Sequence, residues 1–102
     1  MELAEQVYEL VQKLPNDEKY VLSDQMRRAA ISIPSNIAEG HSRSSKSEYL
    51  HFLSIARGSL SELETQIILA QRINYLDKSQ TEKALNLCDE IQKMLSAMIN
   101  RL

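Results

Sequence analysis

Apolar residues recur along this chain in alternating steps of four and three, a spacing that puts them on one face of an α-helix. The repeat is longest between Ser45 and Asn74, and it is equally regular after Ser79. In these two segments the repeating positions are Tyr49, Leu53, Ala56, Leu60, Leu63, Ile67 and Ala70, then Ala84, Cys88, Ile91, Leu95, Met98 and Leu102. The pattern predicts two long amphipathic helices.

Two more helices are predicted upstream. The first covers Glu2–Leu14 and ends at Pro15, and the second covers Asp17–Ser42 with Asn16 or Asp17 as its N-cap. Their apolar faces are Leu3, Val7, Leu10 and Leu14, then Leu22, Met26, Ala29, Ile33 and either Asn36 or Ile37. Because the first helix is much shorter than the third, we expect it to cover only part of its groove, or a second subunit to cover the remainder.

Capping signals and short connections complete the predicted architecture. Capping boxes Ser45-x-x-Glu48 and Ser79-x-x-Glu82 would begin the third and fourth helices. Gly58, in the middle of the third helix, would permit close approach of a neighbouring helix. Short connections make successive helices antiparallel neighbours. The sequence therefore predicts one all-α domain, residues 1–102: an up-down-up-down four-helix bundle with crossing angles near +20°.

The second helix contains a proline in its middle. Pro34 lacks a backbone N–H and crowds the preceding turn, so we expect a kink there. The repeat then brings Asn36 and Gly40 onto the apolar face, where a polar side chain needs a hydrogen bond or an interface. Asn36 would either bond backbone carbonyls freed by the kink or set the oligomeric state.

Composition and charge limit the function classes. The net charge is −2, without the basic excess of a strong nucleic-acid binder. The stretch 27–57 is nevertheless positive by +3, from five basic residues against Glu39 and Glu48. The candidate nucleic-acid-binding residues are Arg27, Arg28, Arg43, Lys46 and Arg57. The alternative is a solvated face with internal ion pairs, such as Glu39 with Arg43 at i,i+4.

No catalytic or metal-binding constellation is recognised. Glu48-x-x-His51 is a single copy of a motif that di-metal bundles use twice, so His51 is better explained as a solvated or interface residue. Cys88, the one cysteine, lies on an apolar face and reads as a core residue. We expect no enzyme activity, cofactor or metal. The lack of a disulfide pair, a signal peptide and an apolar stretch long enough to span a bilayer favours the cytoplasm.

Two runs of residues resemble a known family. The run Gln25–Gly40, QMRRAAISIPSNIAEG, resembles the RRAxxSIPxNIAEG motif of the bacterial four-helix-bundle proteins called 23S rRNA intervening-sequence proteins. The run Ser47–Gln66 resembles the third helix of the same family. The similarity covers nearly the whole chain.

The resemblance implies a four-helix bundle that assembles into a ring-like homopentamer. One branch of the family serves as the accessory protein of diversity-generating retroelements and associates with reverse transcriptase and nucleic acid. Other members are encoded within insertions of large-subunit ribosomal RNA genes, and most have no assigned activity. Two functions therefore compete: a non-catalytic protein that associates with RNA or DNA, and a structural module that docks a partner protein.

Overall fold

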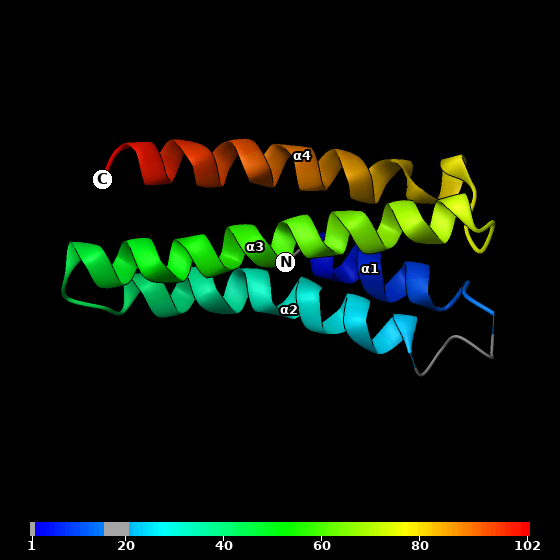
Figure 1. The fold of residues 1–102 in the computed structure, drawn as a ribbon, viewed down its shortest axis with the longest axis horizontal. Helices are drawn as coiled ribbons and strands as arrows, with labels where there is room; N and C mark the ends of the chain where they lie inside the picture. The colour runs from blue at the N-terminus through cyan, green and yellow to red at the C-terminus, as the bar shows by residue number, and fades with distance from the viewer. Residues whose placement is uncertain (1, 16–20) are drawn as a thin grey trace.

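The computed structural model describes residues 2–15 and 21–102, which form four helices. These are α1 (Glu2–Val11), α2 (Leu22–His41), α3 (Lys46–Arg72) and α4 (Lys78–Asn100). No strand occurs within the described ranges. Figure 1 shows α2, α3 and α4 running along one another in alternating directions, with a tight connection at each end of α3. The predicted all-α antiparallel four-helix bundle is confirmed.

The apolar positions predicted from the four-three repeat form the core. On α3, every member from Leu53 to Ala70 is at most 1% exposed. Leu3, Val7, Leu10 and Leu14 of the first segment, and Ala84, Cys88 and Leu95 of α4, are also buried. Ile91, Met98 and Leu102 are half-buried and pack against this core. Burying a Leu, Ile or Val side chain contributes about 1.5–3 kcal/mol, so burial of this shared face favours folding.

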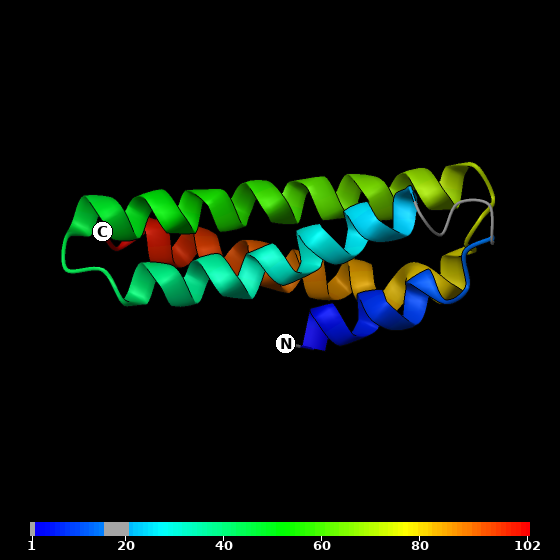
Figure 2. The same ribbon diagram turned by 90° about the horizontal axis from the view of Figure 1, so that it is seen from below.

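The first helix is short, as predicted. α1 has 10 residues against 27 in α3, and it packs against both α2 and α4. Figure 2 shows that α1 begins near the middle of the bundle, so that it lies along only one half of α2 and α4. No helix in the described part of the chain is long and apolar enough to cross a membrane.

Helix α2 differs from the prediction at its beginning. It begins at Leu22, and the predicted caps Asn16 and Asp17 lie outside the described residues. Pro34 lies inside the helix, which continues through it to His41. The carbonyl of Ala30 loses its usual helical donor because proline has no N–H. The kink at Pro34 stays a prediction.

The predicted N-cap of α3, Ser45, is confirmed, without the reciprocal bond from the Glu48 side chain, and the predicted start of α4 is wrong. The Ser45 side chain accepts a hydrogen bond from the Glu48 N–H at 3.1 Å and caps α3. The box at the start of α4 is formed by Asp77 and Gln80, two residues before the predicted pair. Asp77 Oδ1 accepts from the Gln80 N–H at 2.8 Å, and the Gln80 side chain accepts from the Asp77 N–H at 2.9 Å.

The end of α3 explains this shift. Asn74 takes a left-handed conformation with φ 66°, and the Tyr75 N–H donates to the Ala70 carbonyl. This arrangement is typical of a C-terminal cap, in which the next apolar residue folds back onto the helix. Leu76 is accordingly 2% exposed. With Leu76 fixed in the core, Asp77 is the residue that precedes the first turn of α4.

The close helix approach occurs at Gly40 and not at the predicted Gly58. A Cβ added at Gly40 would lie 2.9 Å from Tyr49 Cδ1 and 3.2 Å from Phe52 Cβ, so the Tyr49 ring and the facing backbone of α3 would have to shift. A Cβ added at Gly58 would meet no atom within 4 Å. Gly58 is therefore an exposed helix residue with no packing role in this chain.

The two glycines provide a matched pair of substitutions. Gly58→Ala should raise the free energy of unfolding by up to about 1 kcal/mol, because alanine favours the helix and meets no neighbour. Gly40→Ala should lower it, since overpacking costs about 1–3 kcal/mol and exceeds the same helix gain. Chemical denaturation of both variants measures the difference. Equal stabilisation by both would show that α2 and α3 are not tightly packed at Gly40.

The Asp77 cap should make stability depend on pH. Hydrogen bonds from the Ser79 side chain and from the Gln80 backbone lower the pKa of Asp77 below its ordinary value of 3.8. A carboxyl pKa lowered by folding stabilises the protein above the pKa of the unfolded side chain, and this contribution is lost as pH falls through the folded value. Asp77→Ala should therefore lower Tm at pH 7, and the difference from the unsubstituted protein should shrink below about pH 4.

Ser79→Ala is the control for the Asp77 prediction. It removes the Ser79 hydroxyl that donates to Asp77 Oδ1 at 2.7 Å but leaves the backbone cap in place. Its effect on Tm should be the smaller of the two. A larger loss of Tm in Ser79→Ala than in Asp77→Ala would contradict the assignment of Asp77 as the N-cap and would favour Ser79.

Candidate functional site

Cationic and aromatic side chains gather where α2 turns into α3. The His41 ring lies 5.1 Å from the Tyr49 ring, and the Arg43 guanidinium lies 4.9 Å from the centre of the Phe52 ring. Both aromatic residues come from the first turns of α3, against which Gly40 packs. We call Gly40, His41, Arg43, Tyr49 and Phe52 the hairpin cluster. An open hollow of about 200 Å³ beside it is lined also by Lys46 and two loop serines.

The charges of this region are balanced within one chain. Arg43 donates to the carboxylate of Glu39, one turn earlier on α2. Lys46 is exposed and has no ion pair among the described residues. Between Glu39 and Glu48 there are two basic and two acidic side chains, so the formal charge is zero with neutral histidines. A single copy of the hairpin therefore does not present a strong positive field.

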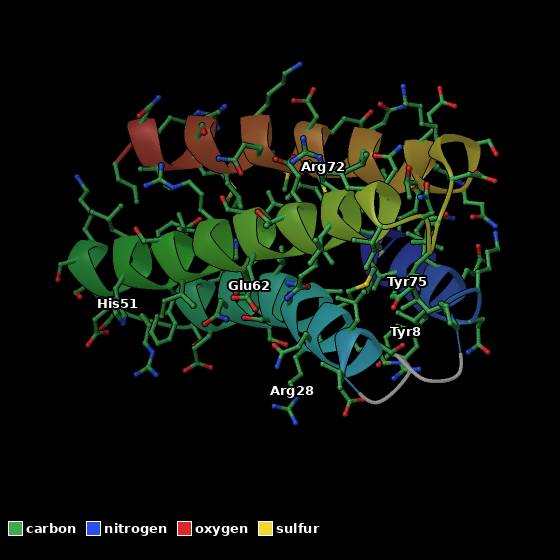
Figure 3. All side chains as sticks on the ribbon, turned by 45° about the vertical axis from the view of Figure 1, so that its right-hand side comes forward. Tyr8, Arg28, His51, Glu62, Arg72 and Tyr75 are labelled. Carbon is green, nitrogen blue, oxygen red and sulfur yellow. The ribbon has the colours of Figure 1, made fainter. Side chains whose placement is uncertain are left out.

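The remaining candidates lie elsewhere on the molecule. Arg27 pairs with Asp24 at 3.4 Å, and its guanidinium lies 5.7 Å from the Tyr8 ring of α1. Arg28 extends away from the bundle near the beginning of α2, far along the long axis from His51 near the beginning of α3 (Figure 3). Arg28 has no ion pair among the described residues.

Arg57 lies on the opposite flank of α3. Gln71, two heptads further along α3, borders a hollow with residues of α4, whereas Ser59 contacts α2. Positions separated by heptads share a face of a helix. Arg57 therefore faces the α4 side, away from Arg28 and from the hairpin cluster. The five predicted basic residues do not form one patch on a single chain.

A polar network joins α2 to α3 beside the core, and the sequence predicts only its Asn36 member. Asn36 Nδ2 donates to the carbonyl oxygen of Ser32 at 2.8 Å and to its hydroxyl at 2.9 Å. The Ser32 and Ser59 hydroxyl oxygens are 2.8 Å apart across the two helices. The carbonyl left free by Pro34 belongs to Ala30, so Asn36 does bond a carbonyl but not that one. Its role in oligomeric state stays a prediction.

His51 is exposed and Cys88 is buried, as the sequence predicts. The His51 ring meets the edge of Phe52 at 5.3 Å and is exposed. Cys88 is fully buried in the core, and burial, with a smaller effect from Glu64, raises its pKa to about 12. A thiol with such a pKa is protonated at neutral pH and is a poor nucleophile. Among the described residues, no three His, Cys, Asp or Glu side chains are grouped to hold a metal ion.

With this geometry established, comparisons with other proteins identify the family. Residues 1–97 match the family described as 23S rRNA-intervening sequence protein. The chain belongs to this family. The resemblance noted in the runs Gln25–Gly40 and Ser47–Gln66 is therefore confirmed, and these runs form most of α2 and α3.

A solved relative supports the same assignment. The chain is 32% identical to a protein of unknown function from the S23 ribosomal protein family of Bacteroides thetaiotaomicron, whose crystal structure superposes with a TM-score of 0.88. The match covers 96% of this chain and 92% of that chain. No curated protein matches. The crystal structure of this relative therefore has the fold described above.

Proposed function

We propose that this 23S rRNA-intervening sequence protein is a non-catalytic, oligomeric helical bundle of the bacterial cytoplasm that associates with RNA or DNA. The observation that supports it is that Arg28, Lys46 and Arg57 lack ion pairs among the described residues. These three side chains are free to contact phosphates, and Arg43 could add a fourth contact if its pair with Glu39 were exchanged. Phosphate contacts supply most of the affinity of non-specific nucleic-acid binding.

Assembly is needed for this function because a single chain is acidic and its cations are dispersed. We propose a homopentamer, as the family resemblance implies. Five copies of the stretch 27–57, each positive by +3, would place a band of positive charge around the assembly. Pooled charge of this kind attracts nucleic acid even when the total charge is negative. Exposed apolar side chains Ile31, Ile55 and Ile68 are consistent with further burial between subunits.

A second candidate function is a structural module that docks a partner protein. It is favoured by the ion pairs of Arg27 with Asp24 and of Arg43 with Glu39, which satisfy two of the five candidate cations within the chain. On this alternative the basic residues serve internal pairs, and no nucleic acid binds. Salt dependence separates the two functions, since phosphate binding releases counterions.

The nucleic-acid prediction concerns Lys46. The affinity of the protein for generic duplex DNA or RNA should fall steeply as salt rises, with a slope near −0.9 per phosphate contacted on duplex DNA. Lys46→Glu should weaken binding and reduce the magnitude of that slope by about one contact. Arg43→Glu should also weaken binding, although it leaves Glu39 next to a second carboxylate. Fluorescence anisotropy over a salt series measures both.

Lys83→Glu is the charge-matched control. Lys83 is exposed on α4 and has no ion pair among the described residues. If Lys83→Glu weakened binding as much as Lys46→Glu, the effect would be one of net charge and not of a site. No binding at low salt would reject the nucleic-acid function and favour the protein-docking module.

The oligomer prediction concerns Asn36. Light scattering at micromolar protein concentration should give the mass of five chains. Asn36→Leu removes the donor to Ser32 and leaves an apolar side chain at this partly exposed position, so it should shift or broaden the mass distribution. A monomer in the unsubstituted protein would contradict the pentamer. An unchanged pentamer in Asn36→Leu would show that Asn36 serves the α2–α3 contact alone.

A further inference from the structure

Apolar side chains are exposed on the side of α3 that faces away from the core. Of the nine large apolar side chains exposed among the described residues, five belong to α3 or to its C-cap, so the unshielded apolar surface is concentrated on this helix. These five are Leu50, Ile55, Ile68, Leu69 and Ile73. The other side of α3 forms the core of the bundle. A helix with apolar residues on both sides is typically buried on both sides.

Three neighbouring rows of residues at heptad spacing make up this surface, which we call the outer face of α3. The middle row is His51, Gly58, Thr65 and Arg72, and the flanking rows are Ser54, Ser61 and Ile68, then Glu48, Ile55, Glu62 and Leu69. Every one of these residues is exposed. Figure 2 shows α3 along one edge of the bundle and α1 along the opposite edge, so α1 does not reach the outer face.

Small residues occupy the centre of the outer face. These are Ser54, Gly58 and Ser61, which lie on adjacent rows. A Cβ added at Gly58 would meet no atom within 4 Å, so packing within the chain does not require a glycine there. Small side chains let two helices approach to about 8 Å, the short end of the usual range. The larger apolar side chains lie on the flanking rows, where they would pack beside a second helix placed along the middle row.

Two unpaired charges of opposite sign lie at the two ends of the outer face. Glu48, near the beginning of α3, and Arg72, its last residue, are exposed and have no ion pair among the described residues. At 1.5 Å per residue they are about 36 Å apart along the helix, too far to pair within one chain. In an antiparallel contact between two α3 helices, each Arg72 meets Glu48 of the other copy. Reciprocal contacts of this kind define a two-fold, self-complementary interface.

The charge of Glu62, near the centre of the outer face, has a neighbouring cation on α2. Ser32 of α2 and Ser59 of α3 are in contact, and the two helices are antiparallel. Arg28 precedes Ser32 by about one turn and Glu62 follows Ser59 by about one turn, so they lie at the same level of the bundle (Figure 3). Where two outer faces meet, two arginines therefore accompany the two Glu62 carboxylates.

We propose that the outer face of α3 binds the same face of a second copy of this chain, antiparallel, about a two-fold axis at the level of Leu60. In this register Leu69 covers His51 of the second copy, and Ile55 covers its Thr65. A ring of five is closed by head-to-tail contacts, so the two-fold contact is additional to the ring and requires neither the ring nor nucleic acid. Ile31, which lies on α2 outside the outer face, stays available to ring contacts.

A cysteine at position 61 tests the two-fold axis. Two copies of Ser61 lie about 3 Å apart along the helices in this register, whereas two copies of Ser54 lie about 18 Å apart. A disulfide needs Cα atoms about 4.4–6.8 Å apart, so Ser61→Cys should form a covalent dimer about fivefold faster than Ser54→Cys, or more. The measurement is non-reducing electrophoresis during air oxidation at about 100 µM protein, where a weak contact is populated.

Ser54→Cys is the matched control, because both serines are exposed and lie in the same row of the outer face. The unsubstituted protein should form no covalent dimer, since its one cysteine, Cys88, is fully buried.

The reciprocal charge pairs are tested by mixing two variants of the Ser61→Cys protein. Glu48→Arg sets two arginines against each other at both ends of the contact, and Arg72→Glu sets two glutamates, so each alone should lower the rate of covalent dimer formation about threefold. An equimolar mixture restores both pairs of opposite charge. It should recover most of the lost rate, as dimers that contain one chain of each variant, which mass spectrometry identifies.

Two results would overturn the two-fold contact. The first is a Ser61→Cys rate no greater than that of Ser54→Cys, which would indicate random collision or a head-to-tail contact through this face. The second is a mixture of Glu48→Arg and Arg72→Glu that dimerises no faster than either variant alone. Neither measurement uses the mass of the oligomer or any RNA or DNA. Failure of the two-fold contact is therefore distinguishable from failure of the pentamer or of nucleic-acid binding.

Discussion

Burial of one face of α3 is the interaction on which the structure depends. The side chains of Leu53, Ala56, Leu60, Leu63, Ile67 and Ala70 are almost fully removed from water, and both α2 and α4 pack on this helix. The contacts that α1 makes with α2 and α4 are shorter, since α1 has only 10 residues. Helix α3 is therefore the scaffold that sets the positions of the hairpin cluster at one end and of the Asp77 cap at the other.

The contact between α2 and α3 is specified by small residues. Gly40 allows the backbone of α2 to approach Tyr49 and Phe52, and the hydroxyls of Ser32 and Ser59 meet across the two helices. A larger side chain at Gly40 would force its neighbours on α3 to shift. The approach at Gly40 also positions the aromatic rings that hold His41 and Arg43. The geometry of the hairpin cluster is thus a consequence of helix packing, which also sets where the charged side chain of Arg43 lies.

The short first helix leaves a structural asymmetry. Ile37, Ile91 and Met98 pack against the core but are only partly buried. Apolar side chains left in this condition are typical of surfaces that another element covers. The cations, by contrast, are dispersed over α2, α3 and their connection, so that a positive surface requires several copies of the chain. The proposed oligomer would bury apolar side chains that one copy leaves partly exposed and would bring its dispersed cations together.

The four helices, most members of the core and the family could be predicted from the sequence. Periodicity is a local property, and each four-three repeat marks the face that α1, α3 and α4 bury, because an amphipathic helix of this length has only one stable way to shield it. The Ser45 cap was also predictable, since a capping box is defined by residues close in sequence. The resemblance of Gln25–Gly40 to the family motif was sufficient for the family.

Which glycine allows close helix packing, and which residue caps α4, depends on the tertiary structure. Gly40 and Gly58 look alike in sequence, but only Gly40 faces another helix at close range. Asp77 and Ser79 can both cap a helix, and the left-handed turn at Asn74 that buries Leu76 selects Asp77. The partners of Asn36 and the separation of Arg28 from Arg57 likewise depend on how the helices face one another. These roles depend on contacts between residues that are distant in the chain, and such contacts cannot be predicted from periodicity and spacing.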